Sequence, residues 1–198
     1  MTCDGLEVPL NNLAGTSVIG TAPLTEAGAC HDSGVILGSV NKMVCASHDH
    51  ANVFDIGDNE IPGGSLTSPQ FLFTISEPGV CNEPGNPLCN GNWHSAAFTW
   101  DGEVIILGWE PGGGSQAECE ATDPDVKKSW FFYDADTGAK LGQFVLPRPQ
   151  GATYWYNGRI YESDITRGLL TSRLNDPAVT SYFRTPHPNP QTQKFSID

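Results

Sequence analysis

Basic residues are scarce in this chain: 10 Lys and Arg stand against 23 Asp and Glu in 198 residues, which gives a formal net charge of -13. The few cations are scattered along the sequence. A surface of this sign repels the phosphates of nucleic acids and of anionic lipids, because binding to them depends on Lys and Arg gathered in a patch. The sequence therefore predicts that nucleic acid is not a partner.

Long apolar runs are also missing. No stretch reaches the roughly 18 apolar residues that a membrane-spanning helix needs, so no such span is predicted. The chain opens without a basic and apolar leader segment, so an exported protein would be written here without its leader. Its 22 Gly, 15 Pro and only 17% charged residues break helices and punctuate short strands. We expect an all-β fold.

The clearest structural signal is a β-hairpin over residues 94–110. Apolar residues alternate with smaller or polar ones up to Asp101-Gly102, a pair that favours a two-residue type I′ turn. The return arm, residues 104–107, is β-branched and apolar on both faces. Such a run predicts a central strand that is buried on both sides.

Similar strand-turn-strand units recur at residues 154–161 and, in a degenerate form, at 31–38. Their spacing is near that of propeller blades with insertions. We therefore predict a partial or small β-propeller of about three to four blades of short antiparallel strands. The predicted division is an entry arm at 1–29, whose one strand is Ser17–Gly20, a propeller-like domain at 30–176 and a Pro-rich tail at 177–198.

Six cysteines in an acidic, Gly- and Pro-rich sequence favour an oxidising compartment, and hence an extracellular or cell-surface location. A disulfide orders a segment that has too little core of its own. The predicted pairs are Cys30 with Cys45 and Cys81 with Cys89, while Cys3 and Cys119 either pair with each other or stay free.

The first candidate site is a metal centre formed by His31, Asp32 and His94. Both histidines stand at the start of a predicted innermost strand, where side chains point toward the central channel. Two imidazoles and a carboxylate suit a divalent metal such as Zn, Cu or Fe. The alternative is that each histidine caps a turn or bonds to a neighbouring blade. A second histidine cluster, His48 and His50, lies on a predicted loop.

Acidic residues offer a Ca²⁺ site instead, at Glu110 with Glu118 or at Asp123 with Asp125, although their spacing matches no EF-hand loop. A solvated acidic loop is the alternative.

A further predicted ligand-binding surface consists of Glu110, Trp109, Tyr154 and Trp155, whose aromatic rings would stack on a sugar or a polymer. The alternative is that they fill the core between blades. A serine hydrolase is not expected, because Ser115 lies in a glycine loop without the strand and helix of a nucleophile elbow.

Several motifs resemble one family, the LVIVD-repeat β-propellers that are secreted or surface-attached in bacteria. The motifs are CHD, WHSAAFTWDG, GWEPGGG, DPDVKKSWFFYDADTGAKLGQFVLPRPQ and YWYNGRIYESDITRGL, and they span roughly residues 28–176. The resemblance implies a propeller but no assigned chemistry. This chain departs from the family pattern after Gln150, where a further blade with its own Cys and His is missing. The resemblance therefore implies that Cys119 has lost its usual partner together with that blade.

Two functions follow as expectations. One is a secreted binding or scaffolding module of unknown ligand, and the other is a metal-dependent enzyme, an oxidoreductase or a hydrolase, built on His31 and His94. The bound ion would be Ca, Zn or Cu. Because few blades leave strand edges and apolar faces open, we also predict self-association into a homo-oligomer.

Overall fold

A computed structural model of the chain describes residues 2–7, 13–23, 30–37, 41–47, 50–57, 63–77, 91–99, 101–111, 122, 124–146, 153–156, 159–164 and 168–173. Within these ranges the strands are β1 (Thr2–Glu7), β2 (Ser17–Pro23), β3 (Asp32–Ile36), β4 (Lys42–Ala46), β5 (Ala51–Asp55), β6 (Gln70–Ile75), β7 (Gly91–Phe98), β8 (Val104–Pro111), β9 (Ser129–Asp134), β10 (Lys140–Val145), β11 (Thr153–Tyr156), β12 (Arg159–Asp164) and β13 (Gly168–Ser172). Two short 3-10 helices, η1 (Leu13–Gly15) and η2 (Asp125–Lys128), accompany them. None of the described helices has the length and apolar character needed to cross a membrane.

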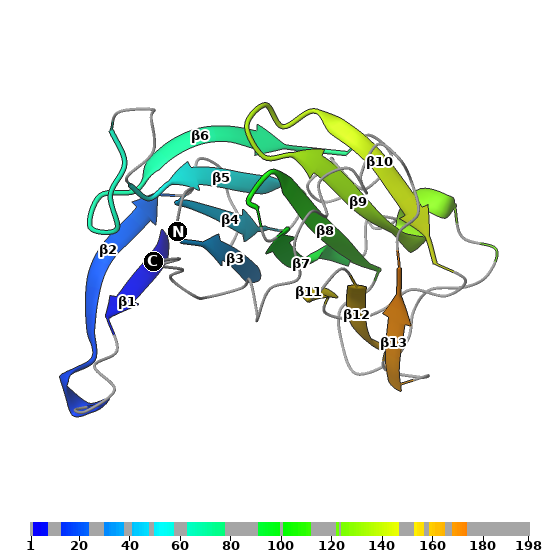
Figure 1. The fold of residues 1–198 in the computed structure, drawn as a ribbon, viewed down its shortest axis with the longest axis horizontal. Coiled ribbons are helices and arrows are strands. Elements are labelled where there is room, and N and C mark those ends of the chain that lie inside the picture. The colour runs from blue at the N-terminus through cyan, green and yellow to red at the C-terminus, as the bar shows by residue number, and fades with distance from the viewer. Residues whose placement is uncertain are drawn as a thin grey trace.

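The strands form antiparallel sheets in which each strand pairs with the next one along the chain (Figure 1). Two sheets have four strands, β3-β4-β5-β6 and β7-β8-β9-β10, and we call them the first and second blades. A three-stranded sheet, β11-β12-β13, follows, and β1-β2 forms a separate hairpin. Four-stranded antiparallel meanders are the blades of a β-propeller. The chain is thus all-β and builds a partial propeller.

The first strands of successive sheets lie next to one another: β3 contacts β7, and β11 contacts β7 and β8 (Figure 1). This is the order expected of innermost strands around a propeller axis. The junction of β3 (residues 32–36) and β7 (residues 91–98) therefore brings together residues that are about sixty positions apart in the sequence.

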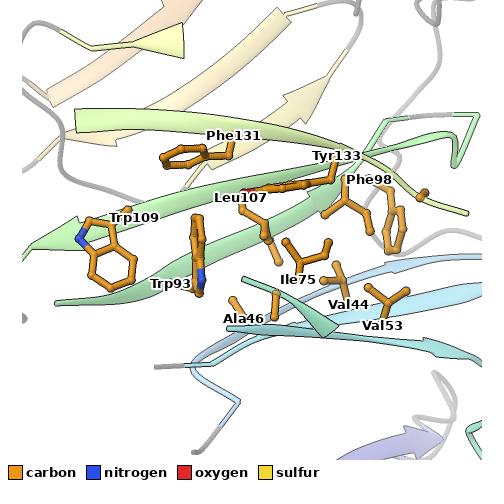
Figure 2. Packing of buried hydrophobic residues seen from close by; sticks show 14 of the residues in the cluster. Val44, Ala46, Val53, Ile75, Trp93, Phe98, Leu107, Trp109, Phe131 and Tyr133 are labelled. Atoms are coloured by element: carbon orange, nitrogen blue, oxygen red, sulfur yellow. The ribbon is translucent and has the colours of Figure 1, made fainter. Parts of the chain in front are cut away.

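Two apolar clusters join the two blades and the three-stranded sheet to one another. The cluster between the two blades includes Val44, Val53, Trp93, Leu107 and Phe131 (Figure 2). A second cluster joins the second blade to the three-stranded sheet, and it consists of Val104, Ile106, Trp130, Phe132, Leu146 and Ile160. Strand β8 supplies both, with residues 105 and 107 on one face and 104 and 106 on the other, all fully buried. The prediction of a central strand buried on both sides is confirmed.

Polar contacts tie the two blades together beside this apolar cluster. The buried ammonium of Lys42 donates to the backbone oxygen of Ala135 at 2.7 Å and forms an ion pair with Asp136.

Glu77, which follows β6, makes a second polar tie. It accepts hydrogen bonds from the Tyr133 hydroxyl and from Lys140 Nζ, both at 2.7 Å. Burial, reinforced by the hydrogen bond to Glu77 and by its charge, raises the pKa of Tyr133 above its ordinary value. The hydroxyl therefore keeps its proton and remains a donor across the blade junction.

The N-terminal arm differs from the prediction. Only Ser17–Gly20 was expected to form a strand, but β2 extends to Pro23 and pairs with a further strand, β1. The sequence of β1, TCDGLE, has no apolar alternation and contains a glycine, so the pattern that reveals a strand is missing.

The turn of the central hairpin follows the prediction in its register. Phe98 pairs with Ile105, so the pairing is centred between Asp101 and Gly102, and Gly102 has a φ of 74°. The hydrogen bond that closes the turn runs from Gly102 N to Thr99 O. In the predicted two-residue turn, with Asp101 and Gly102 as the central pair, the bond would join positions 103 and 100, so the observed bond lies one position earlier in the chain. Thr99 Oγ1 donates to the Asp101 side chain and favours this earlier closure.

Gly34 lies where β3 comes close to β7 of the second blade. A Cβ at this position would lie 2.8 Å from the backbone oxygen of Ala96 and 3.0 Å from Cα of Ala97. We expect Gly34→Val to lower the free energy of unfolding by about 2 kcal/mol, because β3 and β7 must move apart. Urea unfolding measures this, with Ser33→Ala at the exposed neighbouring position as control. Wild-type stability of Gly34→Val would show that the strands do not meet here.

Candidate metal centre

A group of three possible metal ligands lies where the first blade meets the second. His31 immediately precedes β3, His94 lies in β7 and Glu110 lies in β8. One ligand atom of each side chain is within 4.8 Å of the others. The segment before β3 and the strands β7 and β8 thus direct two imidazoles and a carboxylate to one place.

A β-bulge positions His94. Trp93 pairs with Trp109 and Ser95 with Gly108, so His94 is an extra residue in β7 without its own partner in the ladder. Bulges redirect side chains and are frequent beside functional sites. A regular hairpin of the same register would pair His94 with Trp109 and place their side chains on one face. The bulge instead leaves both tryptophans in the apolar cluster and brings His94 beside Glu110.

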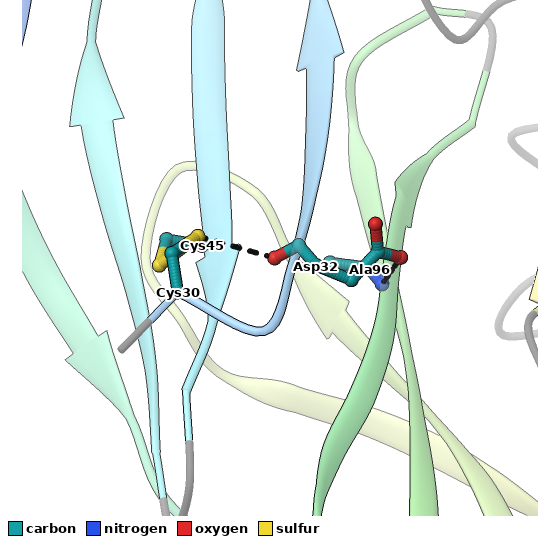
Figure 3. The surroundings of a disulfide bond; sticks show 4 residues. All are labelled: Cys30, Asp32, Cys45 and Ala96. Atoms are coloured by element: carbon teal, nitrogen blue, oxygen red, sulfur yellow. Dashed lines mark hydrogen bonds between the residues drawn. A yellow bond between two sulfur atoms is a disulfide. The ribbon is translucent and has the colours of Figure 1, made fainter. Parts of the chain in front are cut away.

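His31 is held by its backbone and by both of its neighbours in sequence. Its N–H donates to the backbone oxygen of Ala46 at 2.7 Å. Cys30 forms a disulfide with Cys45 in β4, and Cys30 Sγ lies 3.3 Å from the backbone oxygen of Asp32 (Figure 3). On the other side, the Asp32 carboxylate accepts a hydrogen bond from Ala96 N of β7 at 3.3 Å. These contacts fix the segment that carries His31 against both blades.

The distances suit a small transition-metal ion. His94 Nε2 lies 3.4 Å from Glu110 Oε2, and the His31 and His94 ring centroids are 4.7 Å apart. Ligand atoms bound at 2.0–2.2 Å to a tetrahedral Zn²⁺ are about 3.3–3.6 Å from one another. Glu110 and His94 therefore already have the separation of a bound pair. The His31 ligand atom lies within 4.8 Å of the other two, so a small movement of its side chain at most brings it to the distance of a bound ligand.

The site is buried on one side and open on the other. Glu110 is 6% exposed and the His94 side chain 24%, whereas His31 belongs to the exposed residues. His94 Nδ1 is buried and makes no hydrogen bond to any residue that the structure describes. With Nε2 facing the carboxylate, Nδ1 is the nitrogen that carries the proton when Nε2 binds a metal.

The donor set decides which ions fit. Two imidazole nitrogens and one carboxylate oxygen suit Zn²⁺, Cu²⁺ or Fe²⁺. Ca²⁺ takes six to eight oxygen ligands and has no affinity for imidazole, so this group does not match it.

The structure thus brings together two of the three residues predicted as metal ligands, His31 and His94. Asp32 is not in the group, because its carboxylate faces the Ala96 amide. Glu110 takes its place, a residue predicted from sequence only as a Ca²⁺ or ligand-binding residue. The sequence carried no signal for Glu110, because a regular register pairs His94 with Trp109 and places Glu110 on the opposite face, and only the bulge brings the two side chains together.

The other predicted residues have different outcomes. Trp109 is buried in the apolar cluster, so its ring cannot form a stacking surface. His50 is buried rather than exposed on a loop, and Asp125 pairs with Lys128 at 3.4 Å. The predictions for His48, Cys81, Cys89, Glu118, Cys119, Asp123 and the tail at 177–198 fall outside the described residues, as do those for the side chains of Cys3, Tyr154 and Trp155.

No protein-family model and no curated protein sequence matches this chain. Solved structures with a similar fold include the β-propeller domain of Cps50 (Swd1) from Myceliophteria thermophila, at a TM-score of 0.44 and 10% identity over 79% of this chain and 39% of that one. BamB from Moraxella catarrhalis has a TM-score of 0.40 and 13% identity over 79% of this chain and 40% of that one. Sqt1 from Saccharomyces cerevisiae has a TM-score of 0.39 and 10% identity over 76% of this chain and 37% of that one. The chain spans about two fifths of the length of these structures.

Proposed function

We propose that this protein is a propeller-type binding or scaffolding module that binds a divalent transition-metal ion between its first two blades. The observation that carries the proposal is the convergence of His31, His94 and Glu110, whose ligand atoms lie within 4.8 Å of one another. The ion cross-links the two sheets, because one ligand comes from the first blade and two come from the second. Metal binding of this kind contributes to folding stability.

A metal explains the group better than an ion pair alone does. The Glu110 carboxylate is buried, and removing a charge from water is costly unless strong partners compensate. Its contact with His94 is 3.4 Å, which is long for a charge-assisted hydrogen bond. A metal ion coordinated by the carboxylate and both imidazoles neutralises Glu110 and leaves the two adjacent rings uncharged.

The proposed setting is extracellular or at a cell surface. The disulfide between Cys30 and Cys45 supports it, since such bonds persist in oxidising compartments. The resemblance of the sequence motifs to the secreted LVIVD-repeat propellers points the same way. Self-association through open blade edges stays a prediction, which light scattering at micromolar concentration tests.

A metal-dependent enzyme at the same residues is the second candidate. The observation in its favour is that three protein ligands with one solvent-facing side are typical of catalytic zinc, whereas structural zinc has four. Hydrolysis of activated esters by the zinc-loaded protein, abolished in His94→Ala, would favour the enzyme. Stoichiometric metal without turnover favours the module.

The decisive test is metal titration of the untagged protein. We expect calorimetry with Zn²⁺ and with Cu²⁺ to show one ion bound per chain. His94→Ala should lower the affinity at least about 100-fold, because loss of a ligand exceeds the effect of losing a supporting residue. His48→Ala serves as the matched control, since it removes a histidine of the other predicted cluster. Unchanged binding by His94→Ala, or loss in His48→Ala instead, would reject the site.

A further inference from the structure

The metal group is incomplete as a coordination sphere. Among the described residues it contains three ligand atoms, one each from His31, His94 and Glu110. Asp32, the nearest acidic residue in sequence to His31, is directed at the Ala96 amide. Zn²⁺ takes at least four ligands, and Cu²⁺ takes four in a tetragonal arrangement. At least one position on the ion is therefore left to a ligand that is not one of these side chains.

The exposure of the three side chains shows where this position lies. Glu110 is buried and the His94 side chain is 24% exposed, whereas His31 is exposed. A ligand arriving from solvent therefore reaches the ion past His31, the most exposed of the three.

Charge indicates the chemical class of that ligand. A divalent ion with two neutral imidazoles and the Glu110 carboxylate carries a net charge of about +1. A monoanion cancels this charge, whereas a neutral donor leaves it uncompensated in a partly buried site.

We propose that the metal-loaded site takes up a small monoanionic oxygen or nitrogen donor at an open position on the His31 side. The proposal rests on the metal binding proposed above. The step is a ligand exchange: one water leaves the ion and one anion enters, with no change in the oxidation state of the metal and no bond broken in the protein.

The test uses the copper-loaded protein and sodium azide, a small monoanion whose binding to Cu²⁺ changes the absorption and electron paramagnetic resonance spectra. We expect saturable changes at one azide per copper, with copper retained on gel filtration and hyperfine coupling to two imidazole nitrogens preserved. Spectra that stay constant while copper remains bound would mean a closed coordination sphere and would overturn the proposal. Release of the copper by azide would overturn it as well.

A matched variant tests whether Asp32 is a fourth protein ligand of the ion. In Asp32→Asn the amide oxygen can still accept from Ala96 N, so the tie between β3 and β7 is kept while the carboxylate is removed. We expect this variant to retain one copper, the coupling to two imidazole nitrogens and the uptake of one azide per copper, because the hydrogen bond between β3 and β7 is kept. A second azide per copper, or loss of the copper, would identify Asp32 as a ligand and contradict the open position. If no copper binds to the wild-type protein, the proposed function itself fails, which is a separate result.

Discussion

Replacing Phe131 with alanine should lower the free energy of unfolding by about 3–5 kcal/mol, the usual cost of truncating a buried aromatic side chain. Phe131 is fully buried in the cluster between the two blades (Figure 2). Its ring packs edge-on against Trp93 with centroids 5.3 Å apart, and Lys140 Nζ lies 4.9 Å from its centroid. The variant thus loses apolar burial, an aromatic pair and a cation–π contact together. For a domain of ordinary stability, this loss is a large part of the whole free energy of unfolding.

The matched control is Phe144→Ala on β10. Phe144 is 37% exposed, and its ring lies beside Trp130 at the edge of the second blade. Only a partly exposed aromatic pair is lost there, so we expect a cost of about 1 kcal/mol. Urea unfolding followed by tryptophan fluorescence measures both variants. Equal losses would mean that the cluster between the blades is not the main source of stability.

The strands of the blades were predictable because their signals are local. Apolar runs such as residues 104–107 and the Asp101-Gly102 turn pair depend only on neighbouring residues, and the structure has the corresponding hairpin. The β1 strand was not predictable, because its polar sequence gains a partner only when residues 17–23 fold back on it.

The candidate site was only partly predictable for a different reason. Which carboxylate joins His31 and His94 depends on the bulge in β7, and the residue pattern of this strand does not show where the extra residue enters the ladder. The sequence offered Asp32 because it adjoins His31. The fold uses that carboxylate to connect β3 to the Ala96 amide and brings Glu110 to the histidines instead.

Removing the Cys30–Cys45 disulfide should have two effects of separate origin. The first is a loss of about 3 kcal/mol in the free energy of unfolding, as expected for a bridge between residues 15 positions apart. The second is a fall of about tenfold in metal affinity, the size seen when a residue that orients a ligand is lost. The reason is that His31 adjoins Cys30, which the disulfide ties to Cys45 of β4 (Figure 3). The bridge therefore limits how far the His31 imidazole can move from His94.

The experiment is zinc titration of the Cys30→Ser/Cys45→Ser double variant, which is preferable to chemical reduction because free thiolates bind Zn²⁺ themselves. Thermal unfolding first confirms that the variant is folded at the temperature of the titration. The coupling must also be visible in the opposite direction, since linkage is reciprocal for equilibria: saturating zinc should protect the wild-type disulfide at equilibrium, so that a more reducing glutathione buffer is needed to open it. In His94→Ala this protection should disappear. If the double variant binds zinc as tightly as the wild type does, the hydrogen bonds of His31 to Ala46 and of Asp32 to Ala96 suffice to hold the ligand, and the disulfide supports only the fold.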